Sequence, residues 1–319
     1  MENVLLEAEG LTKEFPLKNG KRVHALSDVS LQIYKGETLA LVGESGCGKS
    51  TLGRTLIRLL EPTAGTVRFE GNDITHMRER EFRAYRRKMQ LIFQDPYASL
   101  NPRMTVRDIV AEPLKTYKIC ENREKTTQRV LELLKDVGIP GEFLHRYPHQ
   151  FSGGQRQRIG IARAIALDPS LIVCDEPVSA LDVSVQNQIL NLLRKLQTER
   201  GLTYLFISHD LSVVKFISNR VCVMYLGNLC EVGDTQAIYD APMHPYTRFL
   251  IDAIPKPDPH ARSEKRMLLS DDVPSPINLP DGCRFHTRCP YACDICKREI
   301  PTLKPMNGRL VACHRAGEI

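Results

Sequence analysis

The sequence contains no long uncharged apolar stretch. Its longest candidate, Val221 to Cys230, has about half of the ~18 residues that a membrane-spanning helix needs. The first residues also lack the basic and then apolar layout of a secretory signal peptide, because Glu2, Glu7 and Glu9 stand there. We therefore expect a protein that lies in the cytosol or docks onto a membrane from the cytosolic side.

Aromatic residues are sparse, at 6% of the chain, and tryptophan is absent. A basic run at residues 78–88 includes only Phe82 and Tyr85, whereas single-stranded nucleic acid is bound by basic and aromatic side chains together. We therefore expect no nucleic-acid partner, and the run is either a solvated helix face or a surface for anionic lipid headgroups. The net charge of +6 fits phosphate or membrane contacts without deciding between them.

What the sequence does contain is a glycine-rich motif of the form G-x-x-x-x-G-K-[ST]. The motif is Gly43-Glu44-Ser45-Gly46-Cys47-Gly48-Lys49-Ser50-Thr51. It lies between an expected strand at 38–42 and an expected helix at 50–60, and the backbone N–H groups of such a turn bind phosphates. We predict that Lys49 contacts the β- and γ-phosphates of a nucleoside triphosphate and that Ser50 ligates Mg²⁺. Thr51 adds an α-phosphate contact.

A second motif is an apolar run, Leu171 to Cys174, that ends in two carboxylates. At the end of a buried strand Asp175 can hold Mg²⁺ through water, and Glu176 can accept a proton from an attacking water molecule. An isolated Asp-Glu pair is more often a solvated turn. The apolar run before it and Pro177 after it favour the catalytic interpretation.

Two further polar residues follow expected strands, Gln94 after 89–93 and His209 after 204–207. Each is a weak signal alone, since a polar residue at a strand end is often structural. Beside the two motifs, Gln94 is a candidate sensor of the γ-phosphate and Mg²⁺. His209 is a candidate for contacting the γ-phosphate and orienting the water.

The pattern of apolar residues predicts the fold class. Expected strands alternate with expected helices at 79–88 and 183–200, which predicts an α/β protein with a parallel sheet covered on both faces. From Thr105 to Ala166 the pattern is helical throughout, so this stretch is an expected helical insertion. After about Ile254, frequent prolines and little periodicity predict an extended linker.

Together with Ser152-Gly153-Gly154-Gln155 and Ser179-Ala180-Leu181-Asp182, these motifs resemble those of the ATP-binding-cassette (ABC) ATPases. The resemblance implies a P-loop NTPase fold with a RecA-like core, an antiparallel β subdomain and a helical subdomain at about 96–166. It implies a nucleotide-binding domain at 1–254 and a small Cys-rich extension at 255–319. ATP would be hydrolysed with Mg²⁺ held by Ser50, Gln94 and Asp175.

The resemblance also implies a head-to-tail dimer of two cassettes. Ser152, Gly153, Gly154 and Gln155 of one cassette would then close over the ATP bound by the other. The alternative for this Ser-Gly-Gly is an ordinary helix N-cap, and it can serve as both. Phe15 lies where the family stacks an aromatic on adenine, although an early Phe is more often part of the core.

Residues 93–104 and 151–158 narrow the resemblance to the ATPase subunits of oligopeptide and dipeptide importers, of the F type. This implies a peripheral protein on the cytoplasmic face of the membrane, bound to two permeases and a second ATPase subunit. The pair would be a heterodimer or a homodimer, and an external binding protein would deliver the substrate. The alternative is the same role in a nickel, metal-chelate or opine importer.

Ten cysteines are present, and five of them crowd into the last part of the chain. Those five are Cys283, Cys289, Cys293, Cys296 and Cys313. In a reducing cytosol such a cluster indicates a metal or iron–sulfur site rather than disulfides. In the family, Cys283, Cys289, Cys296 and Cys313 carry a [4Fe–4S] cluster. Zn²⁺ and a disulfide or ligand-free tail are the alternatives, and Cys293 is an extra thiol that can replace Cys296.

Overall fold

The computed structural model describes residues 3–18, 20–254 and 274–319. The linker expected after Ile254 therefore falls largely on 255–273, outside the described residues. The chain forms two compact units, each built from separate stretches of sequence. Unit 1 comprises Asn3, Tyr34–Glu37 and His76–Ile207, and unit 2 comprises Val4–Ile33, Thr38–Thr75 and Ser208–Ile319 without the masked residues.

Unit 1 contains a short parallel sheet in the order β6-β7-β8 and a group of helices. Its elements are α2 (Glu79–Lys88), β6 (Met89–Ile92), α3 (Val106–Thr116), α4 (Arg123–Asp136), the 3-10 turns Gly141–His145 and Pro148–Gln150, α5 (Gly153–Ile165), β7 (Leu171–Asp175), α6 (Val183–Arg200) and β8 (Thr203–Ser208). No strand interrupts residues 105–166, all of which are described, as the helical pattern predicts. β7 and β8 are buried along their whole length, which explains their continuous apolar sequences.

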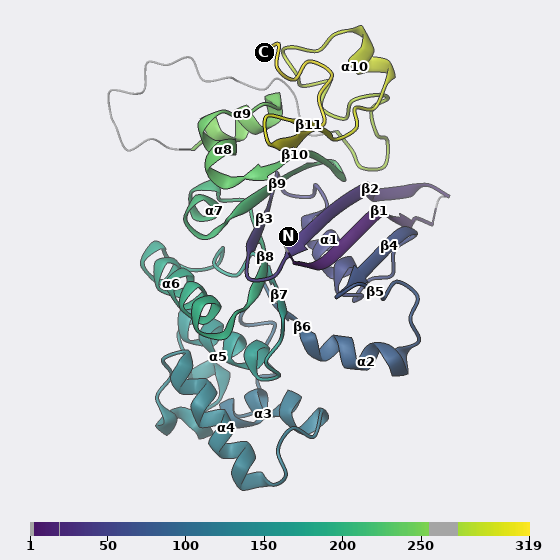
Figure 1. The fold of residues 1–319 in the computed structure, drawn as a ribbon. Coiled ribbons are helices and arrows are strands. Elements are labelled where there is room, and N and C mark those ends of the chain that lie inside the picture. The colour runs from purple at the N-terminus through teal and green to yellow at the C-terminus, as the bar shows by residue number, and fades with distance from the viewer. Residues whose placement is uncertain (1–2, 19, 255–273) are drawn as a thin grey trace, which may run out of the picture. The chain divides into compact units, whose positions relative to one another are not determined.

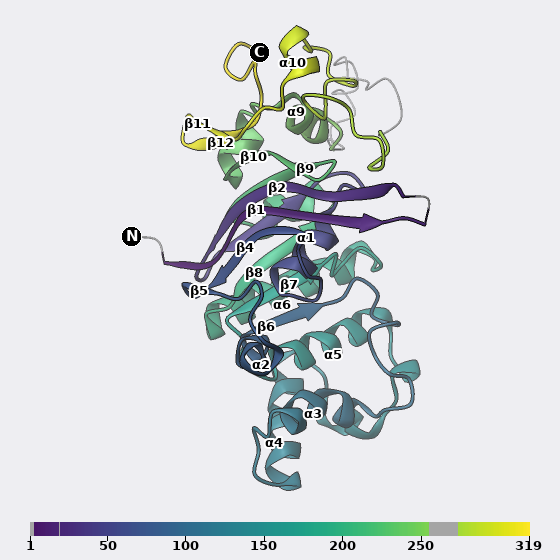
Figure 2. The same ribbon diagram turned by 90° about the vertical axis from the view of Figure 1, so that its right-hand side faces the viewer.

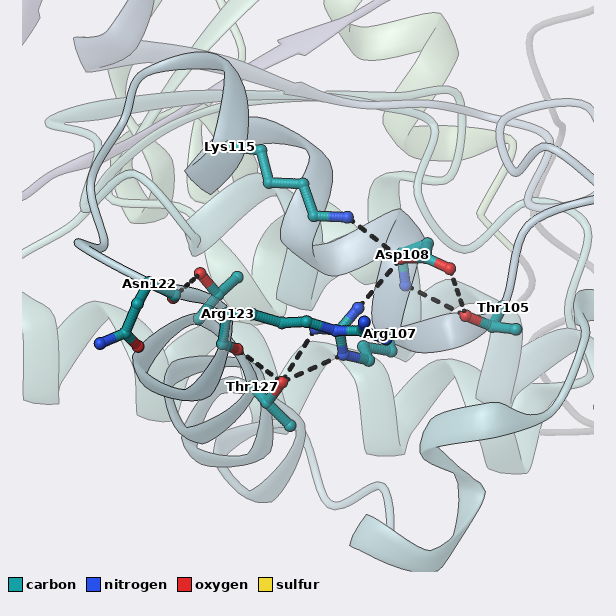
Figure 3. A network of polar contacts seen from close by, with 8 residues as sticks. Thr105, Arg107, Asp108, Lys115, Asn122, Arg123 and Thr127 are labelled. Atoms are coloured by element: carbon teal, nitrogen blue, oxygen red, sulfur yellow. Dashed lines mark hydrogen bonds and ion pairs between the residues drawn. The ribbon is translucent and has the colours of Figure 1, made fainter.

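A polar network holds α3 against α4 (Figure 3). Arg107 donates from Nε and Nη2 to the Thr127 hydroxyl, at 3.1 and 3.0 Å, and from Nη1 to Asp108. Asp108 also accepts from Lys115, and that hydrogen bond lowers the pKa of Asp108. Thr105 caps the start of α3 by accepting from the Asp108 N–H. These contacts brace the outer helices of unit 1.

Unit 2 contains two sheets. One has the order β2-β1-β4-β5, and the strands of the other follow the order β3-β9-β10-β12-β11 (Figure 1). The elements are β1 (Val4–Pro16), β2 (Arg22–Tyr34), β3 (Thr38–Val42), α1 (Lys49–Leu56), β4 (Ala64–Phe69), β5 (Asn72–Asp73), α7 (Leu211–Ile217), β9 (Arg220–Tyr225), β10 (Asn228–Asp234), α8 (Thr235–Asp240), α9 (Pro245–Asp252), α10 (Asp294–Arg298), β11 (Lys304–Met306) and β12 (Arg309–Val311). Only β3 and β9 pair in parallel in this second sheet, whereas β9, β10 and β12 pair antiparallel, which the expected parallel sheet did not include.

The first two strands are longer than the sequence indicates. The apolar pattern predicts short strands at 4–8 and 29–33, whereas β1 and β2 each run for 13 residues. A register shift between Glu9 and Thr12 interrupts the pairing of β1 with β4, and Gly10 has a positive φ of 60° there. Beyond this bulge the strand is partly exposed and polar, which hides it from an apolar-periodicity analysis.

The C-terminal residues 274–319 pack as part of unit 2. β12 pairs antiparallel with β10 and with β11, and Figure 2 shows β11 and β12 beside β10. Phe285 is 1% exposed and belongs to the same apolar cluster as Val42, Val223 and Tyr246. No helix in the described residues is both long and apolar enough to cross a membrane.

Candidate functional site

The phosphate loop leaves β3 in unit 2 and enters α1. Two of its glycines have backbone conformations that a side chain would strain, with φ of 155° at Gly43 and 108° at Gly48. A Cβ at Gly43 would lie 2.1 Å from the Met224 carbonyl oxygen, and one at Gly48 would lie 2.3 Å from that of Ala25. Glycine is therefore required at both positions for the loop to pack against its neighbours.

The side chain of Lys49 lies inside the loop and spans it. It is 5% exposed, and its Nζ donates to the carbonyl oxygens of Gly43, at 2.8 Å, and Glu44, at 2.9 Å. Gly48 precedes α1 without a side-chain cap, so no side-chain oxygen caps the first N–H groups of the helix. A buried cation and an uncapped helix start are what a phosphate chain needs.

Cys47 is a buried thiol within the loop. It is 3% exposed, and burial raises the pKa of its thiol. Its carbonyl oxygen accepts from the Gly227 N–H at 2.9 Å, which ties the loop to the turn between β9 and β10. Cys47 therefore acts as a small apolar residue of the loop.

In unit 1, two predicted catalytic residues touch. The Gln94 Nε2 donates to Glu176 Oε2 at 2.8 Å, so the ends of β6 and β7 bring these side chains together. Glu176 has a positive φ of 47°, and its N–H donates to the Ile207 carbonyl oxygen at 3.1 Å. Asp175, 2% exposed, ends β7. Glu176 therefore takes a left-handed backbone conformation, which is uncommon for a residue other than glycine, directly after β7.

The Ser-Gly-Gly-Gln segment begins α5, also in unit 1. Ser152 Oγ accepts from the Gln155 N–H at 3.3 Å, and Gln155 Oε1 accepts from the Ser152 N–H at 3.1 Å, so the two residues form a capping box. The N-cap expected as one alternative is therefore present. A Cβ at Gly154 would meet Val185 Cγ1 of α6 at 2.4 Å, which requires glycine there.

The remaining predicted residues lie at strand ends and on β1. His209, in unit 2, is exposed and directly follows β8, and Asp210 next to it caps α7 by accepting from the N–H groups of Ser212 and Val213. Phe15 is partly exposed on β1, with Lys13 Nζ 5.0 Å from its ring centroid. Phe15 is therefore not a core residue.

The C-terminal cysteines converge. Cys283, Cys289, Cys296 and Cys313 line one small cavity together with His286, and Cys293 Sγ lies 3.5 Å from Cys296 Sγ. Burial raises the pKa of Cys283 and of Cys289 to about 11. Across residues 3–18, 20–254 and 274–319, no three His, Cys, Asp or Glu side chains are arranged to hold a single metal ion.

The sequence does not predict one set of contacts to the phosphate loop. Arg288 forms a two-pronged ion pair with Glu44, and Tyr246 Oη accepts from the Glu44 N–H at 2.9 Å. Their positions are 244 and 202 residues from Glu44, and no spacing or periodicity connects them. The only signal was indirect, since Arg288 precedes one of the clustered cysteines.

Comparisons with known proteins agree on one family. Residues 26–179 match the family model described as ABC transporter, and residues 230–296 match that of the oligopeptide/dipeptide transporter C-terminal region. The chain is 54% identical to the probable peptide ABC transporter ATP-binding protein y4tS of Sinorhizobium fredii, over 98% of this chain and 90% of that protein. It is 51% identical to the oligopeptide transport ATP-binding protein AppF of Bacillus subtilis, over 98% of both chains.

A solved structure supports the same fold. The ATP-binding cassette MJ0796, in a dimeric post-hydrolysis state bound to ADP and Pi, matches with a TM-score of 0.67 and 32% identity. The match covers 72% of this chain and 99% of that one. The α/β cassette fold expected from the motifs is thereby confirmed.

Proposed function

Because the chain belongs to the ATP-binding proteins of ABC transporters, in the oligopeptide/dipeptide group, we propose that it hydrolyses ATP to drive the import of peptides. The observation on which this depends most is the match over nearly the whole chain to AppF, an oligopeptide transport ATP-binding protein. The preformed phosphate loop, with Lys49 buried across it, supports nucleotide binding. We assign Gly43–Thr51 to the phosphates and Phe15 to the adenine.

Mg²⁺ would neutralise charge on the phosphates and would be held by Ser50, Asp175 and Gln94. The donor set fits, because all three residues offer oxygen ligands. Gln94 donates to Glu176 through its nitrogen, which leaves the amide oxygen of Gln94 to face a cation. Asp175 is buried at the end of a strand, and its carboxylate oxygens are of the kind that ligate Mg²⁺.

Hydrolysis would use Glu176 as the general base. The hydrogen bond from Gln94 fixes the Glu176 carboxylate at a defined position, so a bound Mg²⁺ and the base are linked through one side chain. Glu176 would take the proton of the attacking water, and His209 would orient that water and contact the γ-phosphate. In this scheme Gln94, the sensor of the γ-phosphate, and Glu176, the general base, would respond together to bound ATP.

The working form would be a dimer of two cassettes. Ser152, Gly153, Gly154 and Gln155 would approach the ATP of the partner cassette, as N–H groups at a helix start suit a phosphate. The capping box supports this, because it fixes the tip of α5 before any partner arrives. The MJ0796 cassette is dimeric in the matched structure. The partner would be a second, unlike ATPase subunit, with this chain as the F-type member, or a second copy of the chain.

The complex would include two membrane permeases and, through them, an external substrate-binding protein, with this chain on the cytoplasmic face of the membrane. An uptake assay tests the substrate class. Cells that lack the gene should lose the uptake of radiolabelled oligopeptides and dipeptides, and the wild-type gene, but not a Glu176→Gln version, should restore it. Normal peptide uptake with loss of ⁶³Ni²⁺ or opine uptake would instead establish the alternative importer.

For the cysteine cluster we propose a [4Fe–4S] group held by Cys283, Cys289, Cys296 and Cys313. The four thiols line one cavity, as a Cys₄ cluster requires.

Anaerobically purified protein should be brown and contain iron and sulfide, and Cys313→Ser should reduce both. Colourless protein with one zinc per chain would refute the cluster. A Cys293→Ser variant is the matched control, because Cys293 neighbours Cys296 without belonging to the proposed set. Loss of iron from the control variant would mean that Cys293 is a ligand in place of Cys296.

We also propose that residues 1–254 form the nucleotide-binding domain, with its helical subdomain at about 96–166, and that 255–319 form the extension. Contacts group the helical stretch into unit 1 and residues 274–319 into unit 2. Expression of residues 1–254 alone tests this boundary. An unfolded fragment would contradict the proposed nucleotide-binding domain.

A further inference from the structure

Glu44 is an unexpected side chain in a loop that binds phosphates. Its carboxylate is negative, and like charges repel each other more strongly in a partly buried site than in water. The side chain is 24% exposed, so solvent screens it incompletely. A neighbouring cation must neutralise it if the loop is to hold ATP well.

Arg288 is that cation. Its Nη1 donates to Glu44 Oε2 at 2.7 Å and its Nη2 donates to Glu44 Oε1 at 3.1 Å, which is the parallel two-bond geometry of a strong Arg–carboxylate pair. The Arg288 side chain is 6% exposed. Nη1 also donates to Tyr225 Oη at 3.3 Å, so the guanidinium is held from two sides.

The segment that bears Arg288 is fixed by aromatic packing. The Phe285 ring lies 5.2 Å from that of Tyr225 and 5.3 Å from that of Tyr246, centroid to centroid. Tyr246 in turn accepts a hydrogen bond from the Glu44 N–H. One aromatic cluster therefore positions the backbone of Glu44 directly and its side chain through Arg288.

The same segment contains the clustered cysteines. Cys289 follows Arg288 directly, and Cys283 and Cys289 both pack against the apolar cluster that contains Phe285 and Tyr246. A change in how this segment folds would therefore move Arg288 as well as the thiols.

We infer that Arg288 is a positioning residue of the nucleotide site, which holds and neutralises Glu44 so that the phosphate loop is preformed for ATP. Through it, the folded C-terminal extension sets the affinity of the loop for nucleotide. The inference deepens the proposed function and rests on ATP binding at residues 43–51. It assigns a role in nucleotide binding to a residue far outside the nucleotide motifs.

The test is a titration of the full chain with a fluorescent ATP analogue and Mg²⁺. Arg288→Gln should raise the Kd about tenfold, which equals about 1.4 kcal/mol, and should raise the KM for ATP while kcat changes less than twofold. Arg288→Lys keeps the positive charge but cannot form the two parallel hydrogen bonds of a guanidinium, so its Kd should lie between those of the wild type and Arg288→Gln. An unchanged Kd in Arg288→Gln would overturn the inference.

A double variant separates positioning from mere folding. In Glu44→Gln/Arg288→Gln no carboxylate remains to repel phosphate, so this protein should bind the analogue several-fold more tightly than Arg288→Gln alone. If the double variant binds no better than Arg288→Gln, Arg288 does not act through Glu44 and the inference fails. Near-ultraviolet circular dichroism and iron content identify variants that have lost the fold.

A matched control is available in the same extension. Arg309 Nη1 pairs with Glu231 Oε1 at 3.2 Å, with side chains 7% and 0% exposed, and neither residue belongs to the phosphate loop. Arg309→Gln should lower stability without the rise in Kd, and an equal rise would overturn the inference. Lys49→Ala tests the premise separately, because wild-type protein that binds no more analogue than Lys49→Ala would refute nucleotide binding itself.

Discussion

A hydrogen bond joins two predicted catalytic side chains, those of Gln94 and Glu176. Both residues follow parallel strands that pair with each other, and polar residues at the carboxyl ends of paired strands meet at one sheet edge. The sequence pattern identifies each of them as a strand-end candidate, and the pairing of β6 with β7 in the structure brings them together. The positive φ of Glu176 has no such signature, and it determines where the carboxylate lies.

Glu176→Gln is expected to lower ATP turnover by at least about 100-fold, the usual contribution of a general base. Binding of MgATP should persist, because the amide retains the size of the carboxylate and removes only its basicity. Phosphate release and analogue titration on the same sample separate the two effects. Normal turnover in Glu176→Gln would remove Glu176 from the role of base.

His244 predicts a specific acid sensitivity. It is 2% exposed, its Nδ1 accepts from the Tyr246 N–H at 3.1 Å, and burial lowers its pKa to about 3. Well above pH 6.5, the ordinary pKa of histidine, the residue is neutral in both folded and unfolded chains, so it contributes no pH dependence there. As the pH falls from there toward 3, only the unfolded chain takes up the proton, and stability is lost by up to about 1.4 kcal/mol per pH unit.

His244→Asn should flatten this dependence, because asparagine can still cap α9 and does not titrate. Urea unfolding at pH 7.0 and pH 5.5 measures the change in the free energy of unfolding. The wild type should lose about 1–2 kcal/mol more than the variant between these two values. Equal losses would mean that other groups cause the acid sensitivity.

At the scale of elements, the sequence predicts some boundaries to the residue and misses others. Helices α2 and α6 have the predicted bounds; α6 lies between an Asp182 cap and a Gly201 that takes the left-handed conformation. β11 and β12 have three residues each, too few for any periodicity, and the sequence does not predict them. Their stability comes from pairing with each other and with β10, a distant segment.

Contacts between distant segments of the chain are also the part of the site that the sequence does not predict. The nucleotide motifs are local, because a turn, a strand and a helix next to one another in sequence make the phosphate loop. The pair of Arg288 with Glu44 joins residues 244 positions apart, and nothing in either segment predicts the other. Tertiary packing alone determines such a pair.

The packing of α5 on α6 gives an element-scale prediction. Gly154→Ala would place a methyl group 2.4 Å from Val185 Cγ1, so the two helices must separate. We expect a loss of about 1–3 kcal/mol in the free energy of unfolding, the usual cost of overpacking. Because Gly154 lies in the proposed contact with the partner's ATP, turnover should fall as well.

The double variant Gly154→Ala/Val185→Ala is the matched control, since it removes the atom that the new methyl group meets. The second substitution should restore most of the lost free energy of unfolding, and urea unfolding measures this. If Gly154→Ala is as stable as the wild type, α5 and α6 do not approach each other this closely at Gly154.

At the scale of the whole molecule, the proposed dimer makes activity depend on a second cassette. With Glu176→Gln slowing hydrolysis, MgATP should shift this chain, alone or mixed with its partner ATPase subunit, to a dimer in size-exclusion chromatography with light scattering. Ser152→Arg should prevent that shift while leaving analogue binding intact, because a bulky cation at the tip of α5 blocks only the approach of a partner. A monomer that turns over ATP at the full rate would contradict the dimer.

The ion pair between Glu44 and Arg288 also has a consequence for the synthesis of the chain on the ribosome. The phosphate loop is synthesised early, but its side-chain clamp is 244 residues further along the chain. On the ribosome, the clamp closes only when nearly the entire polypeptide has emerged. A chain that terminates before Arg288 would thus possess every nucleotide motif and still lack the side chain that pairs with Glu44.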